Sequence, residues 1–110
     1  MEAEERFAAL VQKFATEPDV EVPGASNRRR FGSDALKVNG SIFAMVTGGR
    51  LVVKLPRDRV DAVVGAGDGA PFDNGRGRPM KEWLTVVDDD DETWLTLTRE
   101  ALHFVRSKRA

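Results

Sequence analysis

The chain has 110 residues, no cysteine and a formal net charge of −1. A chain of this length suits a single domain that buries its own hydrophobic core, so we expect one domain over residues 1–110. Without cysteine there is no disulfide framework, thiolate metal ligand or cysteine nucleophile, which suits a reducing compartment and favours a cytoplasmic protein. The N-terminal sequence MEAEE is acidic where a secretory signal would be basic, and no apolar run approaches the roughly 18 residues of a membrane span.

The near-neutral total hides three blocks of opposite charge. Residues 1–27 hold six acids and two bases, residues 28–81 hold eleven bases and five acids, and residues 82–110 hold seven acids and four bases. The basic centre could attract an anionic partner, although folding interleaves the blocks and their fields partly cancel. Nucleic acid is therefore left open as a partner, but the composition does not indicate it.

The first expected element is a helix over residues 2–15. Phe7, Leu10, Val11 and Phe14 recur at i, i+3, i+4 and i+7 in an otherwise charged stretch, which is typical of a helix with one buried face. Proline at 18 and 23 and glycine at 24 then interrupt regular structure, so a linker follows. The basic run RRR at 28–30 lacks interleaved aromatic residues, and we interpret it as a solvated strand edge.

Two consecutive hairpins are expected over residues 35–55. Asn39-Gly40 is a strong type I′ turn signal, and the glycine pair at 48–49 marks a second two-residue turn. The predicted register places one set of side chains on the first face of the sheet: Leu36, Phe43, Met45, Val52 and Lys54. The opposite face is continuous and apolar: Ala35, Ile42, Ala44, Val46, Leu51, Val53 and Leu55. We expect helices to cover this second face.

A short helix is expected after Pro56, ending at Gly65 or Gly67. About half of residues 65–79 (GAGDGAPFDNGRGRP) are glycine or proline, which predicts a mobile surface loop. Residues 80–87 are predicted to form a fourth strand, which the acids at 88–91 end. A final helix follows, with its buried stripe formed by Trp94, Leu97, Ala101, Leu102 and Val105.

The expected fold is therefore α+β in the order α-β-β-β-α-β-α, with an antiparallel meander sheet packed by helices on one face. The first and last helices are expected to cover the continuous apolar face. The short middle helix is expected to shield at most part of the other face.

No catalytic or metal-binding pattern emerges from the polar residues. His103 is the sole histidine, it lies on the last helix, and no serine motif accompanies it. The acidic run from Asp88 to Glu92 lacks the glycine of a calcium-binding loop, so we interpret it as a solvated turn that caps a helix. The glycines at 65, 67 and 69 follow a predicted helix, whereas a phosphate-binding loop joins a strand to a helix. We therefore expect no enzyme, no cofactor and no bound metal.

Basic residues supply the candidate ligand-binding groups. Arg76, Arg78 and Lys81 surround the glycine-rich loop and could clamp a phosphate or carboxylate. Lys54 and Arg59 complete the candidate binding set.

Several segments together resemble a known family. They are NGSIFAMV, GRLVVKLP with Arg59 following, GDGAPFD and RPMKEW. The stretch from Leu36 to Trp83 that contains them resembles the N-terminal domain of TfoX/Sxy-type proteins and, more distantly, the YjbR-like small domains. The resemblance implies an α-β(3)-α-β-α fold like that of secretion-chaperone-type domains, and the family is named for regulators of natural competence. None of the segments is a catalytic signature.

We therefore expect a non-enzymatic binding or regulatory domain that acts through a protein partner or as a homodimer. The candidate interface is the first face of the sheet, with Leu36, Phe43, Met45 and Val52 and with Lys54 at its margin, because it is too apolar to be left in water. For this face, the alternative is that the short middle helix and the loop at 65–79 fold back and close it within one chain. The alternative is a binder of a small anionic ligand or nucleic acid that uses the basic central segment.

Overall fold

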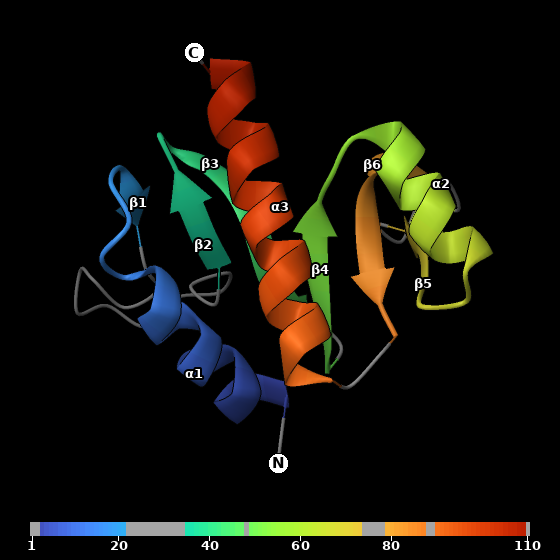
Figure 1. Ribbon diagram of the computed structural model, residues 1–110, viewed down its shortest axis with the longest axis horizontal. Coiled ribbons are helices and arrows are strands. Elements are labelled where there is room, and N and C mark those ends of the chain that lie inside the picture. The colour runs from blue at the N-terminus through green and yellow to red at the C-terminus, as the bar shows by residue number, and fades with distance from the viewer. Residues whose placement is uncertain (1–2, 22–34, 48, 74–78, 88–89, 110) are drawn as a thin grey trace.

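The computed structural model describes residues 3–21, 35–47, 49–73, 79–87 and 90–109. Three helices and a six-stranded antiparallel sheet form an α+β fold (Figure 1). The elements are α1 (Ala3–Phe14), β1 (Val20–Glu21), β2 (Ala35–Val38), β3 (Ser41–Thr47), β4 (Arg50–Lys54), α2 (Arg57–Gly65), β5 (Gly69–Asp73), β6 (Pro79–Val86) and α3 (Asp91–Arg109). The strand order across the sheet is β1-β2-β3-β4-β6-β5. The predicted class and the predicted order of elements are confirmed, with β1 and β5 as additional strands.

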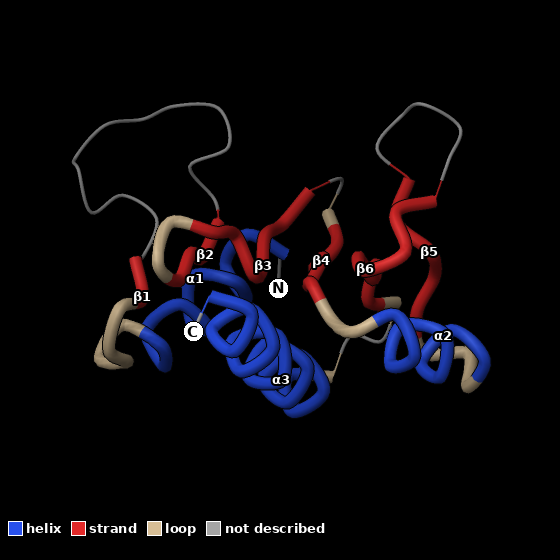
Figure 2. Tube along the Cα trace, turned by 90° about the horizontal axis from the view of Figure 1, so that it is seen from above, coloured by secondary structure: helices blue, strands red, loops and turns tan. Residues whose placement is uncertain are grey.

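All three helices lie on the same side of the sheet (Figure 2). α3 contacts β2, β3 and β4, while α1 contacts α3, β3 and β4. α2 contacts β5 and β6, and its buried Val60 and Val63 belong to the same core as the other helices. The prediction that helices cover one face is confirmed, but the expectation that the middle helix shields part of the other face is wrong. Its apolar stripe extends the common core instead.

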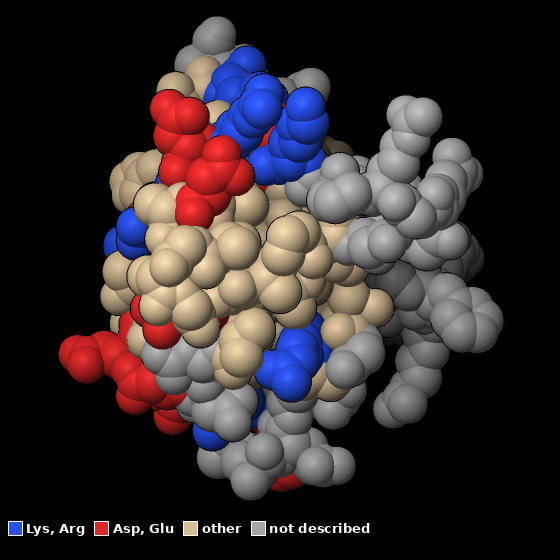
Figure 3. Space-filling model, turned by 90° about the vertical axis from the view of Figure 1, so that its right-hand side faces the viewer, with Lys and Arg blue, Asp and Glu red and all other residues tan. Residues whose placement is uncertain are grey.

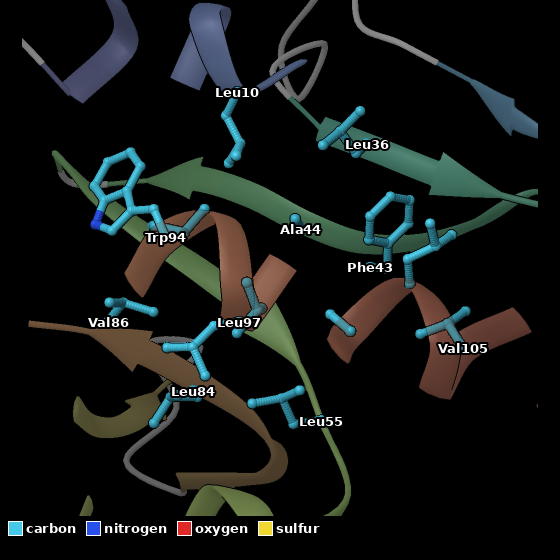
Figure 4. Packing of buried hydrophobic residues seen from close by; sticks show 14 of the residues in the cluster. Leu10, Leu36, Phe43, Ala44, Leu55, Leu84, Val86, Trp94, Leu97 and Val105 are labelled. Carbon is cyan, nitrogen blue, oxygen red and sulfur yellow. The ribbon is translucent and has the colours of Figure 1, made fainter. Parts of the chain in front are cut away.

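The helix stripes expected from the sequence form this core (Figure 4). Leu10 of α1 and Trp94, Leu97 and Val105 of α3 are buried against the sheet, as the periodicity predicts. Asp90 lies at the start of α3, and its carboxylate Oδ2 accepts a hydrogen bond from the backbone N–H of Thr93 at 3.2 Å. The acidic run therefore caps the helix at Asp90, whereas Asp88 and Asp89 lie outside the described residues.

Cross-strand pairing sorts the side chains into two rows, because paired residues of a sheet point to the same face. One row faces the helices: Leu36, Ala44, Val53, Leu84 and Pro71, from β2, β3, β4, β6 and β5. The next row faces away from them: Ala35, Met45, Val52, Thr85 and Ala70, from the same five strands in the same order. The pairing of Met45 with Val52 is as predicted from the turn at 48–49.

A register shift between β2 and β3 corrects the predicted faces. Leu36 pairs with Ala44 but Lys37 pairs with Ile42, so Phe43 is an extra residue on β3. The bulge turns Phe43 to the helix side together with Ala44, and the Phe43 ring meets the ring of Phe14 edge-on at 6.2 Å. Leu36 and Phe43 are both 0% exposed in the common core, so they do not share a face with Met45 and Val52. Ala35 and Ile42, predicted on the side of the helices, lie on the opposite face, since Ala35 pairs with Met45 and Ile42 with Lys37.

The two-residue turn between β2 and β3 forms as the sequence predicts. Asn39 and Gly40 have φ values of 52° and 84°, the positive pair that a type I′ turn requires. The short strand β1 was not predicted, and it pairs with β2 through Val20 opposite Val38. The backbone N–H of Asn39 donates to the carbonyl oxygen of Asp19 at 3.2 Å, which fastens β1 beside this turn.

The expected surface loop over residues 65–79 is in part a strand. β5 occupies Gly69–Asp73 at the edge of the sheet and pairs with β6, whereas residues 74–78 lie outside the described residues. A Cβ atom at Gly69 would lie 2.6 Å from Leu84 Cδ1 and 3.0 Å from the carbonyl oxygen of Thr85. Glycine thus allows β5 to approach β6 closely, so this glycine serves strand packing and not chain mobility.

Replacement of Gly69 by alanine tests this close approach. We expect Gly69→Ala to lower the free energy of unfolding by about 1–3 kcal/mol, because the added methyl group overlaps Leu84. Gly65→Ala is the matched control, since nothing lies within 4 Å of a Cβ atom there and alanine suits a helix. Urea unfolding of both variants measures the difference, and equal stabilities would contradict the packing of β5.

Candidate binding surface

The face of the sheet turned away from the helices is the candidate site, and we call it the helix-free face. It consists of the row through Met45 and Val52 and of the residues beside that row: Lys37, Ile42, Thr47, Arg50, Lys54, Phe72 and Trp83. None of the described helices packs on it (Figure 2). Met45, Phe72 and Trp83 are partly exposed and do not belong to the apolar core under the helices. The face therefore presents apolar side chains outside the core.

Lys54, Trp83 and Phe72 form a cluster on this face. The β4–β6 pairing places Lys54 opposite Trp83, and the Lys54 Nζ lies 5.5 Å from the centroid of the indole ring. The Phe72 ring centroid lies 6.4 Å from that of Trp83 with an interplanar angle of 53°. Such contacts favour the placement of the ammonium group beside the two rings at the surface of the sheet.

The cations of the helix-free face have no carboxylate partner among the described residues. Lys37, Arg50 and Lys54 make no ion pair within this part of the chain, and Arg50 Nη1 donates only a long hydrogen bond of 3.5 Å to the carbonyl oxygen of Val87. Glu21, the pairing partner of Lys37, belongs to the same face. The charge of Arg50 and Lys54 is therefore not neutralised locally by the described carboxylates.

The helix side carries ion pairs between neighbouring elements. They are Arg6–Asp91, Arg59–Glu100, Arg99–Glu17, Arg106–Glu17 and Lys108–Glu82, with N···O distances from 2.8 to 4.0 Å. On the side of the molecule formed by α2 and β5, Lys and Arg atoms gather at the upper end next to Asp and Glu atoms (Figure 3). Opposite charges thus adjoin on this side, in contrast to the helix-free face.

The structure places the predicted anion-binding residues Arg59 and Lys54 on opposite sides of the sheet. Arg59 lies on α2 on the helix side, where its Nε and Nη2 donate to the Glu100 carboxylate at 2.8 and 3.1 Å. This hydrogen bond raises the pKa of Arg59 above its ordinary value, partial burial opposes the rise, and the charge of Glu100 adds to it. Lys54 lies on the opposite face, so Arg59 and Lys54 do not form one site.

Of the other predicted anion-binding cations, Lys81 lies within the described residues. Lys81 is exposed on β6, two residues before Trp83, in the stretch where the β5–β6 pairing is interrupted. Arg76 and Arg78 lie outside the described residues, as does the basic run at 28–30. Lys54 and Lys81 therefore remain as described candidates, without Arg59.

The predicted interface residues likewise lie on two different faces of the sheet. Leu36 and Phe43 are buried under the helices and leave the candidate surface. Val52 lies on the helix-free face but is only 1% exposed, so it supports the surface without contributing much to it. Met45 is the predicted interface residue that is partly exposed there.

Sequence reasoning missed Phe72 and Trp83 as surface residues. Trp83 is expected in a strand and Phe72 in a loop, and the pairing of β4 with β6 could not be foreseen because α2 and β5 lie between these strands in the chain. The alternation of Trp83 with the buried Leu84 was the available signal.

His103 lies on the exposed side of α3, in a shallow groove between α2 and α3. The groove has a volume of about 440 Å³ and is lined by Pro56, Arg59, Glu100, His103, Phe104 and Ser107. Glu100 in this groove is held by Arg59, and the described residues include no group of three or more acids or histidines placed to hold a metal ion.

None of the helices in the described part of the chain is long and apolar enough to cross a membrane. The chain matches no family model, and no curated protein and no solved structure matches it. The resemblance to the TfoX N-terminal domain thus stays a prediction from the sequence.

Alanine substitutions at neighbouring positions test the assignment of faces. We expect Phe43→Ala to lower the free energy of unfolding by about 3–5 kcal/mol, because it opens a cavity in the common core. Met45→Ala should cost about 1 kcal/mol or less, because its side chain is partly exposed on the other face. Urea unfolding compares the two variants, and a larger cost at Met45 than at Phe43 would overturn the assignment.

Proposed function

We propose that this chain is a non-enzymatic binding domain with a regulatory role, and that it acts through protein contacts on the helix-free face. The observation that carries the proposal is the partial exposure of Met45, Phe72 and Trp83 outside the core. Val87 follows β6 at the margin and is 40% exposed. Contiguous apolar side chains on one face are typical of protein interaction sites.

The resemblance to a family named for competence regulators supports the regulatory part of the proposal. The absence of cysteine supports action in a reducing compartment such as the cytoplasm. No catalytic role is proposed for His103, because among the described residues no hydrogen bond joins its side chain to that of Ser107, the hydroxyl in the same groove, and Glu100 is paired with Arg59.

A different chain suits this face better than a second copy of the same chain. A two-fold dimer through the helix-free face would bring Arg50 and Lys54 of one copy toward the same cations of the other. Like charges that approach in an interface oppose association. The homodimer is therefore the less favoured occupant.

Site-specific photo-crosslinking in the native cell tests the proposal. With p-benzoylphenylalanine in place of Met45, we expect a discrete protein adduct. The same residue in place of Ala8, which is exposed on α1, should give none, because it lies on the helix side. An adduct of twice the mass of the chain would identify a homodimer. No adduct above that of the Ala8 control would contradict a protein contact on the helix-free face.

A further inference from the structure

We infer that the partner binds the helix-free face through an acidic segment in which an apolar side chain stands between two carboxylates. The inference rests on the proposed function, since it names the chemistry of the partner for the same face. It depends on Arg50 and Lys54 of β4, which share this face on either side of the buried Val52, and on the partly exposed Met45 that pairs with Val52.

The spacing along β4 sets the spacing of the partner's charges. Arg50 and Lys54 are four residues apart on one strand, which separates their Cα atoms by about 13 Å. An extended segment with acids at positions i and i+4 has the same separation. Its side chain at i+2 points to the same face and would lie over Met45, which is partly exposed beside the buried Val52.

The aromatic cluster gives the apolar part of this segment a place to bind. Trp83 and Phe72 lie beside Lys54, and both rings are partly exposed. An apolar side chain that covers them removes water from the rings and from the Lys54 ammonium group. Loss of water strengthens the attraction between that ammonium group and a carboxylate.

The distribution of charge favours β4 as the centre of the site. Lys37 lies two strands away, and Glu21 on β1 is its pairing partner, so its field is partly offset. No described acid pairs with Arg50 or Lys54 across the strands: their partners are Thr47 and Trp83. Among the described residues of this face, two cations without a paired carboxylate therefore lie beside Met45 and the aromatic cluster.

Nucleic acid fits this surface less well than an acidic protein segment. Affinity for nucleic acid comes mainly from many phosphate contacts, whereas among the described residues strand pairing places three cations on this face: Lys37, Arg50 and Lys54. The partly exposed Met45, Phe72 and Trp83 on the same face match apolar side chains better than a phosphate backbone.

Selection from a peptide library tests the inference. Random 12-residue peptides displayed on phage are selected on the immobilised wild-type protein, and enriched sequences are synthesised for affinity measurements. We expect enrichment of an acid–x–apolar–x–acid pattern. Arg50→Glu and Lys54→Glu should each weaken these peptides at least about tenfold, because the substitutions place like charges together. Lys13→Glu on α1, an exposed lysine on the helix side, should leave the affinity unchanged.

The other outcomes overturn the inference and separate it from the proposed function. If the enriched peptides are neutral or basic and Met45→Lys lowers their affinity, the acidic partner is contradicted. The proposed protein contact on the helix-free face is then still supported. Peptides indifferent to Met45→Lys, or an empty selection, would contradict both.

A labelled 20-residue oligo(dT) is measured in parallel. If the oligo(dT) binds tightly, if its affinity falls steeply with salt and if Lys54→Glu abolishes the binding, the ligand of this face is nucleic acid and not an acidic protein segment. Circular dichroism confirms that each variant is folded.

Discussion

The bulge opposite Leu36 and Lys37 lets β3 turn two neighbouring side chains, Phe43 and Ala44, toward the helices. Strict alternation would have left a large aromatic ring on the opposite face, outside the core. With the bulge, Phe43 meets Phe14 of α1 and fills the region where α1 and α3 approach the sheet. The Phe14–Phe43 contact therefore lies on the helix side. Near β2 and β3 the helix-free face carries no aromatic ring among the described residues, and its apolar side chains there are Ala35, Ile42 and Met45.

The two faces of the sheet then differ in how they are stabilised. On the helix side an apolar core is surrounded by ion pairs such as Arg6–Asp91 and Arg59–Glu100, which are partly exposed. Pairs of that kind contribute about 0–1 kcal/mol each, so the buried apolar stripes of the helices and not the ion pairs hold the layers together. On the helix-free face Arg50 and Lys54 have no described carboxylate to pair with and remain beside partly exposed apolar groups. This unequal distribution is the physical basis of the proposed binding function.

Local signals in the sequence predicted the elements that depend on local chemistry. The stripe from Phe7 to Phe14 gave α1, Asn39-Gly40 gave the first hairpin turn, and the α+β order followed from these and the later segments. β5 was missed because its glycine and proline resemble a loop. The strand tolerates Gly69 because it approaches Leu84 closely, and it tolerates Pro71 because β5 lies at the edge of the sheet. The face of Phe43 depends on a one-residue shift of register, which no local pattern reports. The separation of Arg59 from Lys54 depends on the packing of α2, which is likewise a property of the whole fold.

Binding through the helix-free face requires that Met45 is accessible in the free protein, whereas its neighbour Ala44 is buried under the helices. Because the chain contains no cysteine, single cysteines at these positions can be labelled with a thiol reagent without background. The measurement is the labelling rate of Met45→Cys relative to Ala44→Cys under native conditions. We predict rapid labelling at position 45 and strong protection at position 44, where the side chain is 0% exposed. Equal protection at both positions would show that the helix-free face is covered and would contradict its role as a binding surface.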